Sequence, residues 1–112
     1  TAGLDLADAM GDREFWGRLV ESAVGAHLAN AAAAGDARLF YWRDGNHEVD
    51  FVVEQGRRVV PIEVKSGRAP RIHAGTAAFR QRFKTHRAIL VGGDGVPLEE
   101  FLSEPVTRWT GR

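Results

Sequence analysis

Three charged side chains interrupt two apolar stretches that otherwise have the composition of β-strands. Asp50 stands within residues 47–53 (His-Glu-Val-Asp-Phe-Val-Val), and Glu63 and Lys65 stand within residues 59–66 (Val-Val-Pro-Ile-Glu-Val-Lys-Ser). Asp and, more weakly, Glu and Lys are depleted from strands, and burying a charge is costly unless it is paired or binds a metal. Two carboxylates and an ammonium at one sheet are the groups that metal-dependent phosphodiester hydrolysis requires.

The spacing predicts that these groups meet. Side chains alternate between the two faces of a strand, so Glu63 and Lys65 should share a face, as should Glu48 and Asp50. A hairpin turn at residues 56–57 would place Asp50 opposite Glu63, whereas a turn at residues 55–56 would place Glu48 there. In either register the carboxylates lie within about 5–8 Å, and a divalent cation would relieve their repulsion. Val49, Phe51 and Val53 are expected on the other face of the same strand.

Glu21 is the candidate fourth member of this group. It lies at the edge of the apolar stripe of the first predicted helix, with Gly17 and Gly25 one turn away on either side. Each glycine costs a helix roughly 1 kcal/mol relative to Ala. A helix that approaches the sheet closely at these points would explain the glycines and would bring Glu21 to the same patch as Asp50 and Glu63.

The elements that must position these residues follow from apolar periodicity and turn signals. The pattern predicts one helix from Asp12 to about Ala34, followed by an aromatic strand over residues 38–43 and a turn at residues 44–46. Further strands are predicted at residues 48–54, 58–65 and 87–91, a loop at 66–72, helices at 74–84 and 97–102, and a tail packed by Trp109. The order is α-β-β-β-α-β with a short terminal helix. It indicates a mixed α/β (α+β) fold whose sheet is a three-strand antiparallel meander plus a parallel fourth strand.

The bulk composition is typical of one soluble globular domain. The chain has 112 residues, 44% hydrophobic and 27% charged, and contains no cysteine, which excludes disulfides and thiolate chemistry. No apolar run approaches the roughly 18 residues of a membrane span. We therefore expect a cytoplasmic location, one domain over residues 1–112 with a lead-in at 1–11 and a tail at 103–112, and no membrane contact. Because the chain starts at Thr1, we interpret it as a fragment of a longer protein.

The net charge is zero, but basic residues are concentrated in one part of the chain. Residues 57–87 contain nine bases and one acid, whereas residues 1–56 contain ten acids and four bases. Such a basic segment is the electrostatic footprint of a phosphate-backbone partner, and the alternative is a solvated face paired with the acidic half. The candidate nucleic-acid-binding residues in this segment are Arg57, Arg58, Arg68, Arg71, Arg80 and Lys84.

These motifs resemble those of a known nuclease superfamily. Glu21, Asp50 and Glu63-Val64-Lys65 on an α-β-β-β-α-β core are similar to the PD-(D/E)xK, restriction-endonuclease-like proteins. Residues 15–21 (Phe-Trp-Gly-Arg-Leu-Val-Glu), 41–52 and 62–66 resemble more closely the uncharacterised C-terminal domain that follows an AAA-type ATPase module in bacterial and archaeal proteins. The resemblance covers residues 15–102. Val49 stands where the superfamily has a proline before its first acid.

The resemblance implies specific roles for the four residues. Asp50 and Glu63 would ligate Mg²⁺ or Mn²⁺, Glu21 would assist as an outer or second-site ligand, and Lys65 would orient the attacking water and stabilise the developing charge. The resemblance also implies a function, namely metal-dependent cleavage of nucleic acid in a domain attached to an AAA-type ATPase. DNA is the expected substrate. The alternative is a non-catalytic domain of the same fold that provides DNA contacts, protein contacts or a homo-oligomer interface.

Overall fold

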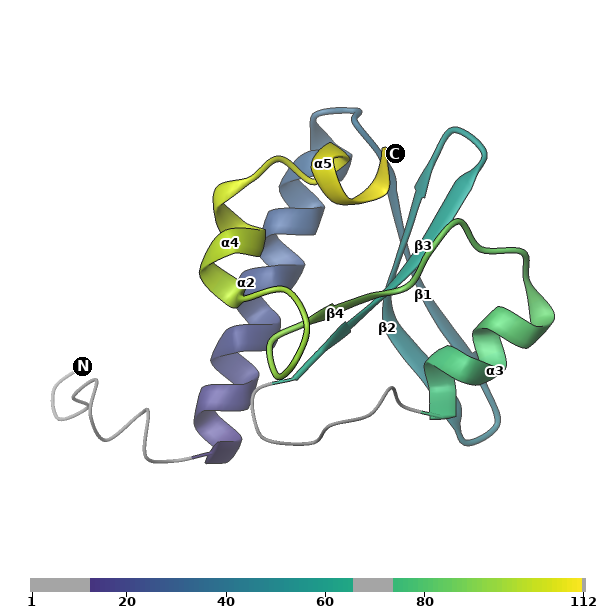
Figure 1. Cartoon of the computed structure of the whole chain (residues 1–112), viewed down its shortest axis with the longest axis horizontal. Helices are drawn as coiled ribbons and strands as arrows, with labels where there is room; N and C mark the ends of the chain where they lie inside the picture. The colour runs from purple at the N-terminus through teal and green to yellow at the C-terminus, as the bar shows by residue number, and fades with distance from the viewer. Residues whose placement is uncertain (1–12, 66–73, 112) are drawn as a thin grey trace, which may run out of the picture.

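A computed structural model describes residues 13–65 and 74–111 and contains the predicted order of elements (Figure 1). The candidate loop at 66–72 and the start of the first helix at Asp12 lie outside the described residues. The elements are α2 (Arg13–Ala33), β1 (Arg38–Asp44), β2 (His47–Gln55), β3 (Arg58–Val64), α3 (Ala74–Arg82), β4 (Ile89–Val91), α4 (Leu98–Ser103) and α5 (Thr107–Thr110).

The four strands form one mixed sheet in the order β1-β2-β3-β4. β1, β2 and β3 pair antiparallel, and β4 pairs parallel to β3, as the sequence predicts. Both hairpin turns contain a glycine at positive φ, Gly45 at 61° and Gly56 at 62°, a conformation that β-carbons disfavour. Gln55 pairs with Arg58, so the β2–β3 turn is at residues 56–57. The first of the two predicted registers is confirmed.

Helices cover both faces of the sheet (Figure 1). On one face, Val24 and Leu28 of α2 form the main core with Val53, Val60 and residues of β4, and α4 and α5 add Phe101 and Trp109. On the other face, Phe79 of α3 packs on a smaller cluster formed by Val49 and Val52. α2 approaches the sheet at Gly25, where a β-carbon would lie 3.2 Å from the Phe51 ring. The predicted role of this glycine is therefore confirmed.

A β-bulge in β2 overturns one prediction about its faces. Phe40 of β1 pairs with Val52 and Trp42 pairs with Val49, so Asp50 and Phe51 together oppose the single residue Tyr41. An extra residue of this kind breaks the regular alternation of side chains. Val49 consequently packs on the α3 side with Val52, not on the α2 side with Phe51 and Val53 as strict alternation predicted.

The remaining differences lie at the ends of elements. β4 spans only Ile89–Val91, shorter than the predicted strand, and α3 ends at Arg82. Trp109 is buried, as expected of a packing residue, but it belongs to the short helix α5. Within the described residues, no helix combines the length and the apolar character needed to span a membrane.

Candidate functional site: a pocket where two strands separate

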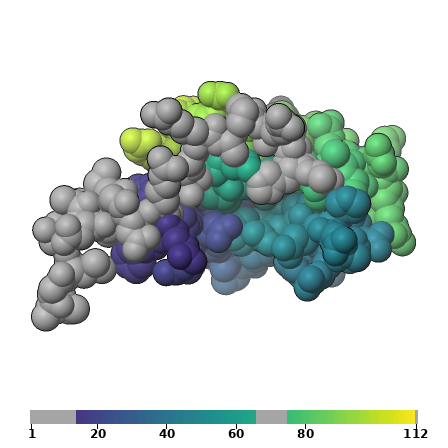
Figure 2. All heavy atoms as spheres, turned by 90° about the horizontal axis from the view of Figure 1, so that it is seen from below, coloured from purple at the N-terminus to yellow at the C-terminus, as the bar shows by residue number. Residues whose placement is uncertain are grey.

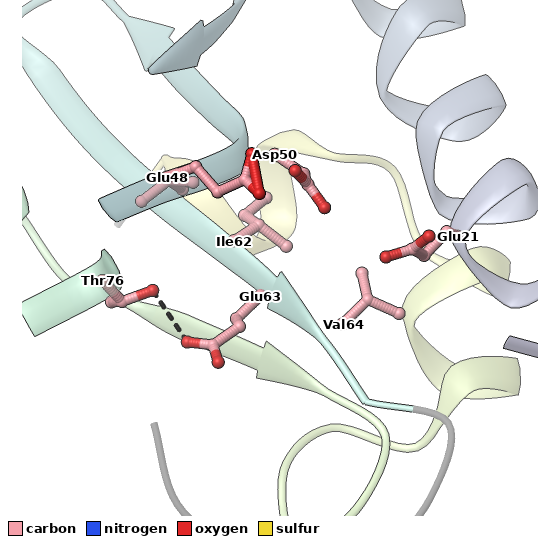
Figure 3. A pocket seen from close by; sticks show the side chains of 8 residues that line it. Glu21, Glu48, Asp50, Ile62, Glu63, Val64 and Thr76 are labelled. Atoms are coloured by element: carbon pink, nitrogen blue, oxygen red, sulfur yellow. Dashed lines mark hydrogen bonds between the residues drawn. The ribbon is translucent and has the colours of Figure 1, made fainter. Parts of the chain in front are cut away.

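The candidate site is a pocket at the point where β2 and β3 part. In the described part of the chain, the pairing of β2 with β3 runs from Gln55–Arg58 to Phe51–Ile62 and stops there. Beyond that point β2 continues beside β1, and β3 continues beside β4. A cavity of about 150 Å³ opens at this fork, and its lining comes from α2, β2, β3 and α3 (Figure 3). The lining residues are Glu21, Glu48, Val49, Asp50, Ile62, Glu63, Val64 and Thr76.

Glu21 and Asp50 form the first half of the site. Figure 3 shows the two carboxyl groups pointing toward one another from α2 and β2. Burial raises the pKa of Glu21, and the neighbouring Asp50 carboxyl raises it further. Burial and the nearby charge of Glu48 raise the pKa of Asp50. The pair therefore holds a proton more readily than two isolated carboxylates do.

Glu63 and Lys65 form the second half, on the α3 side of the sheet. The Thr76 hydroxyl donates a 2.7 Å hydrogen bond to Glu63 Oε1, and Lys65 Nζ lies 3.9 Å from Glu63 Oε2. The Glu63 and Lys65 side chains are only 10% and 8% exposed. The prediction that these two residues share a face is confirmed. The surrounding contacts hold the Glu63 carboxylate in place, and its ammonium neighbour compensates its charge.

The bulge explains why two strand-neighbour acids face different helices. The register makes Asp50 and Glu63 the next residues along their strands after the Phe51–Ile62 pair. Asp50 nevertheless faces Glu21 of α2, whereas Glu63 accepts a hydrogen bond from Thr76 of α3. Both line the same cavity because the strands have separated there. The structure thus brings Glu21, Asp50 and Glu63 to one pocket. Lys65 contacts Glu63 but is not itself among the lining residues.

Tight packing at the start of α3 fixes the second half of the site. A β-carbon on Gly75 would lie 2.0 Å from the Glu48 carbonyl oxygen, so only glycine allows α3 to rest on β2 there. Thr76, the next residue, is thereby placed against Glu63. A β-carbon on Gly92, after β4, would lie 2.0 Å from the Lys65 carbonyl oxygen. The backbone at Lys65 is therefore held by a second close approach.

The donor set fits a hydrated cation held by two carboxylates. Within residues 13–65 and 74–111, no three His, Cys, Asp or Glu side chains are grouped closely enough to hold a metal ion by themselves. Mg²⁺, however, commonly keeps several waters and takes only one or two carboxylates. Glu21 and Asp50 supply such a pair, and one water needs only roughly 10–15 Å³ of cavity. A pocket of about 150 Å³ has room for the ion with its remaining waters.

Two polar residues of the site were not among the predicted ones. Thr76 bonds Glu63, and Glu48 accepts a 2.7 Å hydrogen bond from the Tyr41 hydroxyl while its charge raises the pKa of Asp50. The sequence predicted that Glu48 shares a face with Asp50 but gave it no role in the site. Its charge within an apolar strand was the feature that could have indicated one. Thr76 carried no signal, because a threonine in the first turn of a helix is ordinary.

Of the candidate nucleic-acid-binding residues, those that the structure describes do not line this pocket. Arg57 and Arg58 lie at the β2–β3 turn, five or more residues from Glu63 along β3, which is about 17 Å at roughly 3.3 Å per residue. Arg80 is exposed on α3, and Lys84 follows that helix. Arg68 and Arg71 lie outside the described residues. Within the described part, the expected basic segment is thus distributed over the turn and α3.

Comparison with known protein families gives a match over most of the chain. A model described as "Domain of unknown function (DUF4143)" matches residues 16–102, most of the chain. A comparison with curated proteins finds no match, and neither does a comparison with solved structures.

Proposed function

The chain belongs to the DUF4143 family, and from its pocket we propose that it is a divalent-metal-dependent phosphodiesterase acting on nucleic acid. The observation that carries the proposal is the meeting of Glu21, Asp50 and Glu63 at one cavity, with Lys65 beside Glu63. The mixed sheet with α2 and α3 on opposite faces supports a restriction-endonuclease-like fold for this domain. Attachment to an AAA-type ATPase is part of the same proposal and derives from the sequence resemblance.

In this proposal the two halves of the pocket have different tasks. Asp50, with Glu21, would hold Mg²⁺ or Mn²⁺ at the fork, and the bound ion would polarise the phosphoryl group and lower the pKa of a bound water. Glu63 faces the cavity from the opposite strand and would hydrogen-bond that water or complete the ligand set. Lys65 would stabilise negative charge on the phosphoryl oxygens through its ammonium group.

The raised pKa values support a role for a cation. Without one, the pKa of each carboxyl is raised above its ordinary value, that of Glu21 by burial and Asp50 and that of Asp50 by burial and Glu48. A divalent ion would displace protons bound to the pair and stabilise both carboxylates in their charged form. Cation binding should therefore release protons, and its affinity should rise with pH until both carboxyls are ionised.

A nuclease assay with matched variants tests the proposal. The 112-residue chain would be incubated with single- and double-stranded DNA and with RNA, in 5 mM MgCl₂, MnCl₂ or CaCl₂ or in EDTA. We expect cleavage with Mg²⁺ or Mn²⁺ in the wild type, loss of at least 100-fold in Asp50→Asn and Glu63→Gln, and wild-type rates in Glu54→Gln. Glu54 is the matched control because it is a carboxylate on β2, ion-paired with Arg38 and distant from the pocket.

The outcome separates catalysis from binding. Cleavage that persists in both Asp50→Asn and Glu63→Gln would show that the pocket is not the catalytic site. DNA binding without cleavage under every condition would select the alternative function, a non-catalytic DNA-binding or protein-binding domain. One observation favours the protein-binding form of that alternative, namely a groove lined by aromatic residues beside β1.

A further inference from the structure

β1 is an edge strand with an unusual concentration of exposed aromatic side chains. It ends the sheet on one side and pairs only with β2 within the described residues. Phe40, Tyr41 and Phe83 are 42%, 55% and 40% exposed, three of the four large hydrophobic side chains exposed in the described part of the chain. Edge strands usually carry charges or prolines that discourage further pairing, but residues 39–42 (Leu-Phe-Tyr-Trp) contain neither.

A hollow beside this edge enlarges the apolar surface. Phe40 and Trp42 of β1 line a groove of about 430 Å³. Its other side is formed by Phe79 of α3 and by Phe83, which directly follows that helix. Trp42 meets both phenylalanine rings edge-on, at centroid distances of 5.3 and 6.1 Å. Figure 2 shows atoms of the β1–β2 hairpin (blue) next to those of α3 (green) at one end of the molecule. A contiguous exposed apolar surface of this kind is typical of an interaction site.

The sequence of β1 identifies a second copy of the chain as the occupant. Residues 38–44 read Arg-Leu-Phe-Tyr-Trp-Arg-Asp. On the face that Phe40 and Trp42 share, Arg38 gives a positive charge at one end and Asp44 a negative charge at the other, whereas Arg43 belongs to the opposite face. If two β1 strands pair antiparallel about Tyr41, Arg38 of each copy faces Asp44 of the other, and Phe40 faces Trp42. The strand is thus complementary to itself in charge and in aromatic character, as a two-fold interface requires.

The charges around β1 extend this complementarity. Within one chain, Arg38 lies 3.3 Å from Glu54, and Asp44 lies 3.0 Å from Arg82. In the paired arrangement a row of alternating charges would cross the interface, from Glu54 and Arg38 of one copy to Asp44 and Arg82 of the other. The Arg38 and Asp44 side chains are 74% and 59% exposed, so each can take a second partner.

We infer that the chain forms a homodimer through antiparallel β1–β1 pairing, which joins two four-stranded sheets into one of eight strands. Every second residue of an edge strand directs its N–H and C=O groups outward, so backbone hydrogen bonds accompany the ion pairs. The exposed Phe40 and Tyr41 and the partly buried Trp42 become interface residues. This inference is independent of the proposed nuclease activity, because no residue of the fork pocket takes part in the pairing.

A charge-reversal experiment tests the pairing. Sedimentation velocity of the 112-residue chain over 1–200 µM should give a species of twice the 12.3 kDa chain mass. Arg38→Asp places like charges at both ends of the interface, and so does Asp44→Arg. Because exposed ion pairs and like-charge pairs each change binding only modestly, the two altered contacts should together raise the dissociation constant by about 10- to 30-fold in either variant.

Mixing the two variants supplies the decisive comparison. In the mixed dimer, the aspartate at position 38 of one copy faces the arginine at position 44 of the other. At the opposite end of the interface, the unchanged Arg38 still faces the unchanged Asp44. Dimerisation should therefore return to within about threefold of wild type. Arg18→Asp is the matched control, because Arg18 is an exposed arginine paired with Glu14 on α2, and this variant should dimerise normally. Circular dichroism would confirm that every variant is folded.

Three results would overturn the inference. They are a wild-type chain that stays monomeric at 200 µM, a dimer that neither substitution weakens, and a mixture of variants that does not regain dimerisation. A strictly monomeric chain would indicate that the exposed edge accepts a strand from another protein instead.

Discussion

Asp50→Asn should stabilise the ion-free protein at neutral pH, because the fork pocket concentrates negative charge. The Asp50 carboxyl lies beside that of Glu21, and the charge of Glu48 also raises its pKa. Asparagine keeps the shape of the side chain, removes its charge and can donate a hydrogen bond to Glu21. Removing two partly solvated like-charge contacts is worth roughly 0.5 kcal/mol each, so the free energy of unfolding should rise by about 1 kcal/mol. At about 2.1 cal/mol/K of unfolding entropy per residue, a chain of 112 residues should gain about 4 °C in Tm.

The pH dependence gives this prediction its sign. The pKa of Asp50 is raised in the folded state, by burial first and then by Glu48, so the folded protein retains a proton that the unfolded chain has lost. Stability therefore falls as pH rises above the ordinary carboxyl range near 4. The advantage of Asp50→Asn should be complete at pH 7 and should disappear by about pH 3, where both states carry the proton.

Thermal melts followed by circular dichroism at pH 3, 5 and 7, without divalent ions, would measure the effect. Glu54→Gln is the control, because this β2 carboxylate is paired with Arg38 and its loss should leave Tm unchanged or slightly lower. A lower Tm for Asp50→Asn at pH 7 would refute the reasoning. So would an equal gain at pH 3 and pH 7, since that would have no connection with ionisation.

Three further outcomes follow from the site. Adding 10 mM MgCl₂ at pH 7 should raise the Tm of the wild type but not that of Asp50→Asn, measured by the same melts; equal shifts would place ion binding elsewhere. Lys65→Met should lower the free energy of unfolding, measured by urea denaturation, by about 3 kcal/mol, because it leaves the Glu63 carboxylate buried beside an apolar group. The double variant Lys65→Met/Glu63→Gln should lose less stability than Lys65→Met alone. Gly75→Ala should destabilise by about 1–3 kcal/mol in spite of its better helix propensity, since its β-carbon meets the Glu48 carbonyl, whereas the exposed Gln81→Ala on the same helix should be neutral.

The sequence was sufficient to predict the order of elements and to reduce the register of the central hairpin to two alternatives. Gly56 belongs to both candidate turns, and its positive φ suits a hairpin, but only the pairing of Gln55 with Arg58 selects the turn at residues 56–57. Gly25 was also interpretable, since a glycine in the buried stripe of a helix indicates close approach to another element. Local patterns of this kind depend on a few neighbouring residues and can be read directly.

The arrangement within the site depended on contacts between distant residues. The bulge at Asp50 is defined by the pairing of β2 with β1, where Asp50 and Phe51 together oppose Tyr41. The sequence of residues 47–53 alone does not predict it. The bulge places the Asp50 carboxyl beside α2 while Glu63 faces α3, although the predicted pairing put both side chains on one face of the sheet. Thr76 was equally unpredictable, because its value as a partner of Glu63 depends on the Gly75 contact with β2.

The separation of β2 and β3 has a consequence for the motions of this corner of the sheet. In the described part of the chain, residues 48–49 pair only with β1 and residues 63–64 only with β4, whereas Val52 and Val53 are paired on both sides. The amides of the two diverging ends should therefore exchange with solvent deuterium sooner than those in the middle of β2. A ligand that contacts both ends would hold them together. Slower deuterium exchange at both ends at the same time would therefore show that a ligand is bound, even when no nucleic acid is cleaved.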